Sequence, residues 1–228
     1  KEKLQATHTS LTDSINYAQR IQAAMLPTLG TFSDHFSGYF ILYRPRDVVS
    51  GDFYWAQRIN QHLVFTVADC TGHGVPGAFV SMLGISLLSE IVTRRQILSP
   101  EKALHVLREE VKTALKQTQQ ETALANSDGM DIALCCLNLE TGELFYAGAH
   151  NPLLWVRNGE MHIIKADRQP IGVYMKERPF KLHSLRLQKG DKLYLYSDGY
   201  QDQTGGSAKK KFKSSRFRES LLAFSGAP

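Results

Sequence analysis

Three aspartates stand at the edges of apolar, strand-like runs, close to glycine: Asp52, Asp69 and Asp198. A carboxylate at the end of a buried strand costs free energy unless a cation or several hydrogen-bond donors compensate it. A nearby glycine lets the backbone, and any bound group, approach closely. Each aspartate alone also fits an ordinary turn. If the fold brings the three strand ends together, however, they form a site for a hard cation.

An oxygen-only site with room for water favours Mg²⁺ or Mn²⁺ over Zn²⁺. Two such ions bridged by one carboxylate lower the pKa of a water molecule and stabilise in-line attack on phosphorus. The three aspartates therefore predict a divalent-cation site suited to phosphoryl transfer, on the condition that their strands converge.

A second interpretation concerns the glycines that follow Asp69. The run Gly72–Gly77 satisfies GxGxxG, follows a predicted strand and opens a helix, which is the context of a dinucleotide-binding fingerprint. Asp69 would place a negative charge where a pyrophosphate should sit, and a second helix follows where a parallel strand is required. We therefore expect a tight loop that presents the Asp69 carboxylate and a backbone carbonyl to a metal.

The first 26 residues predict a helix that ends before Pro27. Residues on one face recur in alternating steps of four and three: Leu4, His8, Leu11, Ile15, Ala18, Gln22 and Met25. This stripe fits either a helix docked on its own domain or a coiled linker that forms a homodimer or connects to an upstream sensor domain.

The remaining chain predicts short strands and two amphipathic helices. The helices begin at Pro76 and, with Ser99 as N-cap, at Pro100, and a short last helix covers 216–224. The predicted strands cover 38–43, 53–59, 62–68, 130–139, 144–150, 153–157, 161–165, 181–187 and 192–197. Turns such as Asn158-Gly159 link them as hairpins, which implies antiparallel sheets. We expect an α+β layered domain with the sheets inside and the helices outside.

Composition narrows the class of protein. The chain has 228 residues, of which 43% are hydrophobic and 21% charged, so a disordered tail and a disulfide-stapled mini-protein are excluded. Lys and Arg cluster between 209 and 218, in a loop that is either simply solvated or a docking patch for an acidic partner. Because the rest of the chain is nearly neutral, we do not expect nucleic-acid binding.

The cysteines and the apolar runs indicate the compartment. Three cysteines, Cys70, Cys135 and Cys136, form no CxxC pair, which suits a reducing cytoplasm. In a strand, the last two would point to opposite faces. The uncharged stretch Gly77–Ser89 is shorter than the ~20 residues that cross a bilayer, so we expect no membrane segment in this fragment.

Five ordered motifs give the sequence a specific resemblance over roughly residues 14–222. They are Gln22–Pro27, Ser50–Tyr54, Asp69–Gly74, Ala147–Leu153 and Ser197–Gly199. In this order they resemble the metal-dependent protein phosphatase superfamily (type 2C-like), in its bacterial branch typified by stage II sporulation protein E and the regulators of stress-response sigma factors.

The resemblance implies an αββα sandwich of two antiparallel sheets, with two Mn²⁺ or Mg²⁺ ions between them and phosphoserine or phosphothreonine proteins as substrates. Asp69 matches the carboxylate that bridges both ions, and Cys70 the position that contributes its backbone carbonyl. Asp198 matches a ligand of one ion. Asp52 matches an acidic position that holds the other, directly or through water.

Further residues gain expected roles from the same comparison. His73 is the candidate proton donor to the leaving alkoxide, although a histidine that only locks the glycine loop by hydrogen bonds is the more common arrangement. Arg44 and Arg46 precede the first acidic motif and could bind the substrate phosphate, or simply be solvated. His150 and Asn151 are expected to support a turn between strands.

One departure from the family separates two hypotheses. Family members end in a further strand that carries a metal-binding carboxylate, and we find none before Pro228. Asp128 and Asp131, in an earlier strand, are unconvincing substitutes. The first hypothesis is a phosphatase acting on a signalling protein such as an anti-sigma-factor antagonist, with residues 1–27 as a linker and 28–228 as the phosphatase domain. The second is a catalytically weak pseudo-phosphatase that binds phosphoproteins.

Overall fold

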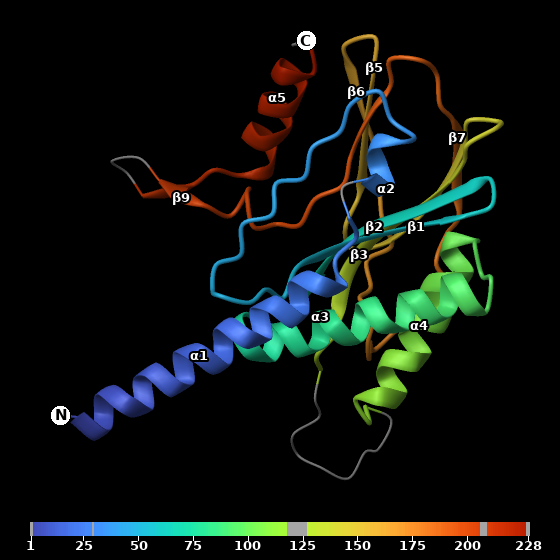
Figure 1. Ribbon diagram of the computed structural model, residues 1–228. Coiled ribbons are helices and arrows are strands. Elements are labelled where there is room, and N and C mark those ends of the chain that lie inside the picture. Colours follow the sequence, from blue (N-terminus) through green and yellow to red (C-terminus); the bar gives the residue numbers. More distant parts are fainter. Residues whose placement is uncertain (1, 29, 118–126, 206–208, 227–228) are drawn as a thin grey trace.

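The computed structural model describes residues 2–28, 30–117, 127–205 and 209–226 (Figure 1). The helices are α1 (Glu2–Met25), α2 (Gly30–Ser33), α3 (Gly74–Ser89), α4 (Pro100–Ala114) and α5 (Ser214–Ser225), and a π-helical turn, η1 (Glu90–Arg94), continues α3. The strands are β1 (Phe53–Ile59), β2 (His62–Cys70), β3 (Met130–Asn138), β4 (Glu143–Ala149), β5 (Leu153–Arg157), β6 (Glu160–Ile164), β7 (His183–Arg186), β8 (Lys192–Tyr194), β9 (Thr204–Gly205) and β10 (Lys210–Lys211).

Two antiparallel sheets form the centre of the domain. The larger has the order β1-β2-β3-β4-β7, the smaller has the order β6-β5-β8, and β9 and β10 form a separate hairpin. The ladders between these strands are all antiparallel. Tight turns join some of the pairs, such as β5 and β6 at Asn158-Gly159, where both residues have positive φ, whereas α3 and α4 lie between β2 and β3 in the chain. The expected α+β class is confirmed.

The larger sheet separates two hydrophobic clusters. In β2, Val64 and Ala68 belong to the cluster beneath α3 and α4, whereas Leu63 and Phe65 belong to the cluster that includes residues of the smaller sheet. This division follows from the period of two along a strand. It also places Cys136 on the helix side. Helices therefore cover one face of the larger sheet, and the smaller sheet covers the other. Helix α5 stands beside the smaller sheet (Figure 1).

Helix α1 docks on the domain with its last turns only. Gln22 is buried, Met25 packs against the cluster beneath α3, and α1 contacts α3. Leu4 and Leu11, nearer the start, are 77% and 60% exposed, and Figure 1 shows this half of α1 projecting from the body. The docked arrangement therefore holds for the end of the predicted stripe, while its first half has no intramolecular partner within the described ranges.

Two predictions about local structure were wrong. Residues 38–43 form no strand and join no ladder among the described residues, and Phe40 and Leu42 are exposed, so the apolar run there does not reflect burial. The predicted basic loop instead contains β10, which pairs with β9, and the first turn of α5. Most of the predicted polar loop at 117–128 lies outside the described residues.

Helix Gly74–Arg94 is long and apolar enough to cross a membrane by length and composition. Half of its most apolar window is buried inside the domain, where Val80, Ile85 and Leu88 contribute to the cluster beneath the larger sheet. Its apolar character is therefore explained by its position as a core helix.

Candidate metal centre

Three aspartates form a row across one end of the larger sheet. Asp69 lies directly opposite Asp131 in the β2–β3 ladder, and Asp52 directly precedes the first β1–β2 pair, Phe53 with Ala68. Because side chains alternate along strands, these positions share the face of Leu63 and Phe65. The three carboxylates therefore lie at the edge of the space between the two sheets.

The smaller sheet supplies the fourth carboxylate. Asp198 follows β8. Its charge raises the pKa of Asp69, and the two side chains share a hydrogen bond. Its neighbour Ser197 donates a hydrogen bond from Oγ to Asp52 Oδ2 at 2.6 Å. The structure thus brings Asp52, Asp69 and Asp198 together from both sheets, which is the convergence that the sequence analysis required. Their role as metal ligands stays a prediction.

The row of carboxylates changes the protonation of its central member. Burial raises the pKa of Asp69 to about 8, and the charges of Asp52 and Asp198 add to this effect. Burial, followed by the charge of Asp202, also raises the pKa of Asp198. Near neutral pH the cluster therefore retains a proton unless another positive charge replaces it. An oxygen-rich cluster in which Asp52 and Asp69 have no basic partner among the described residues fits a hard divalent cation.

The carboxylates are close but not yet arranged as a coordination sphere. Within the described ranges, no three His, Cys, Asp or Glu side chains meet the geometry of a ready metal centre. An ion bound here would have to draw the carboxylates together, with water completing its coordination, as is usual for Mg²⁺.

Cys70 presents its backbone carbonyl, not its thiol, toward Gly51. The side chain is 4% exposed and belongs to the cluster beneath the helices. Burial, together with the charge of Asp69, raises the pKa of its thiol well above the ordinary range, so the sulfur stays protonated. The carbonyl oxygen lies 3.1 Å from the point that a Cβ on Gly51 would occupy. Only this oxygen suits a hard cation.

Close backbone contacts fix the glycine loop against the Asp52 segment. A Cβ on either Gly51 or Gly77 would lie 2.6 Å from the carbonyl oxygen of Gly72, which is too short for any side chain. Gly72 itself has φ +85°, a conformation that favours glycine. The Thr71 N–H donates to the Gly129 carbonyl at 2.9 Å. These glycines therefore serve close packing, in agreement with the tight loop predicted from sequence.

His73 has an acidic partner that the sequence analysis missed. Its Nδ1 lies 2.8 Å from Oδ2 of Asp47, and the side chains are 65% and 40% exposed. The pair leaves the Nε2 of His73 free of any partner in the described part of the chain. Arg44 and Arg46, in the same segment as Asp47, are exposed, and the described residues include no ion-pair partner for either.

His150 and Asn151 hold Asp131 in place. Nδ1 of His150 lies 2.8 Å from Asp131 Oδ1, and Asn151 Nδ2 donates to the Asp131 backbone carbonyl at 3.1 Å. His150 has φ +56°, and its N–H donates to the Asp167 carbonyl at 2.9 Å. From the sequence, Asp131 is an unconvincing ligand because it lies in an earlier strand. The structure places it in the row of carboxylates. Its place opposite Asp69 depends on the pairing of β2 with β3, which α3 and α4 separate in the chain.

A buried amide joins α1 to the Asp52 segment. Gln22 is 4% exposed, and its Nε2 donates to the Ser50 carbonyl at 2.7 Å and to Ser81 Oγ at 2.9 Å. The Ser50 N–H donates in return to Gln22 Oε1 at 3.0 Å. The side chain therefore connects α1, α3 and the residues just before Asp52. The interruption of an apolar stripe by glutamine was the sequence signal for this contact.

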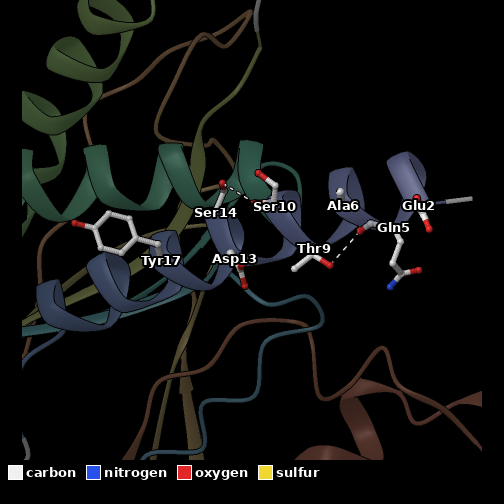
Figure 2. Close-up of a pocket in the computed structure, with 8 residues that line it drawn as sticks. All are labelled: Glu2, Gln5, Ala6, Thr9, Ser10, Asp13, Ser14 and Tyr17. Atoms are coloured by element: carbon white, nitrogen blue, oxygen red, sulfur yellow. Dashed lines mark hydrogen bonds between the residues drawn. The ribbon is translucent and has the colours of Figure 1, made fainter.

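The exposed half of α1 carries a shallow, open depression. Figure 2 shows its lining residues, which all come from this helix: Glu2, Gln5, Ala6, Thr9, Ser10, Asp13, Ser14 and Tyr17. The hydroxyls of Thr9 and Ser14 donate to carbonyls one turn earlier, at 3.0 and 2.9 Å. The depression shares no residue with the carboxylate row, so we assign it no chemistry.

Comparison with known proteins decides the family. A model described as "Stage II sporulation protein E (SpoIIE)" matches residues 60–227. The chain belongs to the stage II sporulation protein E family. The matched region includes Asp69, Asp131 and Asp198, whereas Asp52 and α1 precede it.

Solved structures extend this similarity to nearly the whole chain. The SiaA-PP2C domain of Pseudomonas aeruginosa is 31% identical, with a TM-score of 0.82, over 98% of this chain and 86% of that one. The RsbU and RsbW domains of Rv1364c from Mycobacterium tuberculosis, at 23% identity and a TM-score of 0.60 over 80% and 48% of the two chains, share the fold. The fold is that of the PP2C phosphatase domain.

One curated relative of this chain is named as a phosphatase. "Phosphoserine phosphatase RsbP" of Bacillus subtilis (strain 168) is 26% identical over 164 residues, which is 71% of this chain. The match spans 39% of the relative's length.

Proposed function

We propose that this domain is a Mg²⁺- or Mn²⁺-dependent protein serine/threonine phosphatase. The convergence of Asp69 and Asp198 from two sheets is the observation that carries the proposal, because it places acidic groups around Asp69, which has no basic partner among the described residues. The name of the relative RsbP supports phosphoserine as the substrate group.

Each ligand has a defined place in this proposal. Asp69, in the middle of the row, would be shared by two ions. Asp198 would hold one of them, and Asp52, oriented by Ser197, would hold the other directly or through water. The Cys70 carbonyl contributes a neutral oxygen. When bound, Mg²⁺ or Mn²⁺ would neutralise the phosphoryl group and lower the pKa of an attacking water molecule.

Exposed side chains before and after the first acidic motif would bind the substrate phosphate and protonate the leaving group. Arg44 and Arg46 are proposed to bind the phosphate, since guanidinium groups match its geometry. His73 is proposed to protonate the departing serine oxygen through its free Nε2, because an alkoxide is a poor leaving group. Asp47 fixes the orientation of the ring through Nδ1 and so acts as a positioning residue.

Regulation is proposed to reach the site through α1. Residues 1–27 would link the phosphatase domain to an upstream sensor on the same chain, and the exposed stripe that includes Leu4 and Leu11 would form a homodimer. Gln22 would convey movement of α1 to Ser50 and hence to Asp52. A phosphorylated anti-sigma-factor antagonist in the cytoplasm is the proposed substrate.

The proposal is tested by Mn²⁺-dependent hydrolysis of p-nitrophenyl phosphate. Native protein should release p-nitrophenol only with metal, and Asp69→Asn should reduce kcat by at least about a hundredfold. Asp13→Asn, on the exposed half of α1, is the matched control and should not change kcat. Equal turnover by native protein and Asp69→Asn would exclude the metal mechanism. Native protein that binds a phosphopeptide without hydrolysing either substrate would instead be the pseudo-phosphatase.

A further inference from the structure

The main charge asymmetry of the molecule lies in residues 209–218, which we term the basic segment. Its six cations are Lys209, Lys210, Lys211, Lys213, Arg216 and Arg218, and it contains no acidic residue. The whole chain has 27 basic and 22 acidic side chains, so the remainder is close to neutral. A concentration of one sign of charge creates a local field that attracts the opposite charge.

Two contacts through Asp202 connect the basic segment to Asp198. The Asp202 N–H donates to the Asp198 carbonyl at 3.0 Å, and Lys211 Nζ lies 2.6 Å from Asp202 Oδ2. The charge of Lys211 acts on Asp198 itself. The hairpin β9–β10 is therefore adjacent to the carboxylate that is proposed to hold a metal ion.

Aromatic contacts give the basic segment a small core of its own. Phe217 is buried, and its ring lies 4.9 Å from that of Tyr196 and 5.3 Å from that of Tyr200. Phe212 makes an edge contact with Tyr200 at 5.5 Å. Since Tyr196 and Tyr200 flank Asp198, these contacts tie the position of the basic segment to the site.

Most cations of the basic segment have no acidic partner in the described residues. Lys211 alone forms an ion pair, and Arg216 lies over the Phe212 ring at 5.8 Å. Lys209, Lys210 and Lys213 are exposed. Like charges this close repel one another, so an acidic ligand would relieve the repulsion.

We infer that the basic segment docks the acidic surface that surrounds the phosphoserine of a protein substrate. The inference rests on the proposed phosphatase function and deepens it, since it adds a recognition surface beside the reacting group. A phosphoprotein is favoured over nucleic acid because the basic segment reaches Asp198 through Lys211, and a single phosphate would be held at Asp198. Docking brings the phosphate to the site with a higher local concentration and a faster association rate.

Peptide binding tests this inference without requiring turnover. A fluorescent phosphoserine peptide flanked by Asp and Glu is titrated with the whole chain in EDTA, and anisotropy gives Kd. The variant Lys209→Glu/Lys210→Glu/Lys213→Glu should raise Kd about tenfold, and added salt should weaken binding to native protein. The control Lys102→Glu/Lys165→Glu/Lys189→Glu makes the same charge change elsewhere and should keep the native Kd. Thermal unfolding checks that both variants are folded.

A second peptide identifies what the lysines recognise. In it, Asn and Gln replace Asp and Glu around the phosphoserine, and its Kd should be raised for native protein but insensitive to the lysine substitutions. Equal effects of the two triple variants, or a single-stranded oligonucleotide that competes as well as the acidic peptide, would overturn the inference. If native protein did not hydrolyse p-nitrophenyl phosphate, that result would contradict the phosphatase assignment alone. The peptide-binding measurements do not depend on turnover.

Discussion

Asp69 and Asp131 face each other across the β2–β3 ladder, so that two carboxylates lie side by side at the entrance to the space between the sheets. Like charges in this arrangement destabilise a sheet, and His150 compensates only Asp131, through its 2.8 Å contact. Asp69 is left with Asp52 and Asp198 as its other neighbours. The fold thus gathers acidic groups around Asp69, which is the basis of the following predictions.

The first prediction concerns pH in the absence of metal. The pKa of Asp69 is raised from its ordinary value of 3.8 to about 8, so the folded protein retains a proton that the unfolded chain releases. The free energy of unfolding should therefore fall as pH rises through this interval. Urea denaturation in EDTA at several pH values measures the slope of the free energy of unfolding against pH. Asp69→Asn should flatten it, whereas Asp13→Asn should not, and an unchanged slope in Asp69→Asn would contradict the prediction.

The second prediction concerns Gln22. Gln22→Leu leaves the buried N–H of Ser50 without its acceptor, which should cost about 1–3 kcal/mol of stability. Because Ser50 lies close to Asp52, Mn²⁺-dependent kcat should also fall about tenfold. Gln19→Leu, on the exposed side of the same helix, is the matched control for both measurements. A stable Gln22→Leu protein with native kcat would remove the link between α1 and the site.

The third prediction concerns the contact between Gly77 and Gly72. A methyl group at Gly77 would lie 2.6 Å from a backbone carbonyl, so Gly77→Ala must displace the loop and should cost about 1–3 kcal/mol. Thermal unfolding and Mn²⁺ affinity should both decline. Gly38→Ala, which meets nothing within 4 Å, should leave both at their native values. Native Mn²⁺ affinity in Gly77→Ala would show that the loop does not set the ligand geometry.

The fourth prediction separates proton donation from metal binding. His73→Asn should lower kcat for a phosphoserine peptide by about a hundredfold or more, because its leaving group is an alkoxide. Hydrolysis of p-nitrophenyl phosphate, whose leaving group needs no proton, should change little. Asp47→Asn should show the same pattern more weakly, since it only orients the ring. Equal losses with both substrates would indicate a structural role for this pair.

The sequence allowed good prediction of elements whose pattern reflects burial. Strand β1 matches its predicted bounds, and Ser99 and Pro100 stand at the start of α4 as expected, because a short run rich in aromatic residues and a proline in the first helical turn are local signals. The prediction of a strand at 38–43 failed because an apolar run with strand propensity does not by itself supply a neighbouring strand. The hairpin β9–β10 was missed because it pairs only two residues per strand, and its lysines give no apolar pattern typical of a strand.

The site was predictable where motif and strand end coincide, as at Asp69. Asp47 and Asp131 were not identified because each depends on a long-range contact, with His73 and His150 respectively. No local pattern encodes such a pairing. Gln22 is intermediate, because a polar residue in an apolar stripe signals a buried hydrogen bond without naming the partner.

Crystals soaked in Mn²⁺ and examined by anomalous scattering test the central claim most directly. The account predicts manganese peaks at the carboxylates of Asp69 and Asp198, with Asp69 shared between ions and the Cys70 carbonyl facing one of them. Asp69→Asn crystals, soaked in the same way, should lose these peaks. Manganese found only at other surface carboxylates of the native protein, with none beside Asp69, would contradict the metal centre and with it the proposed chemistry.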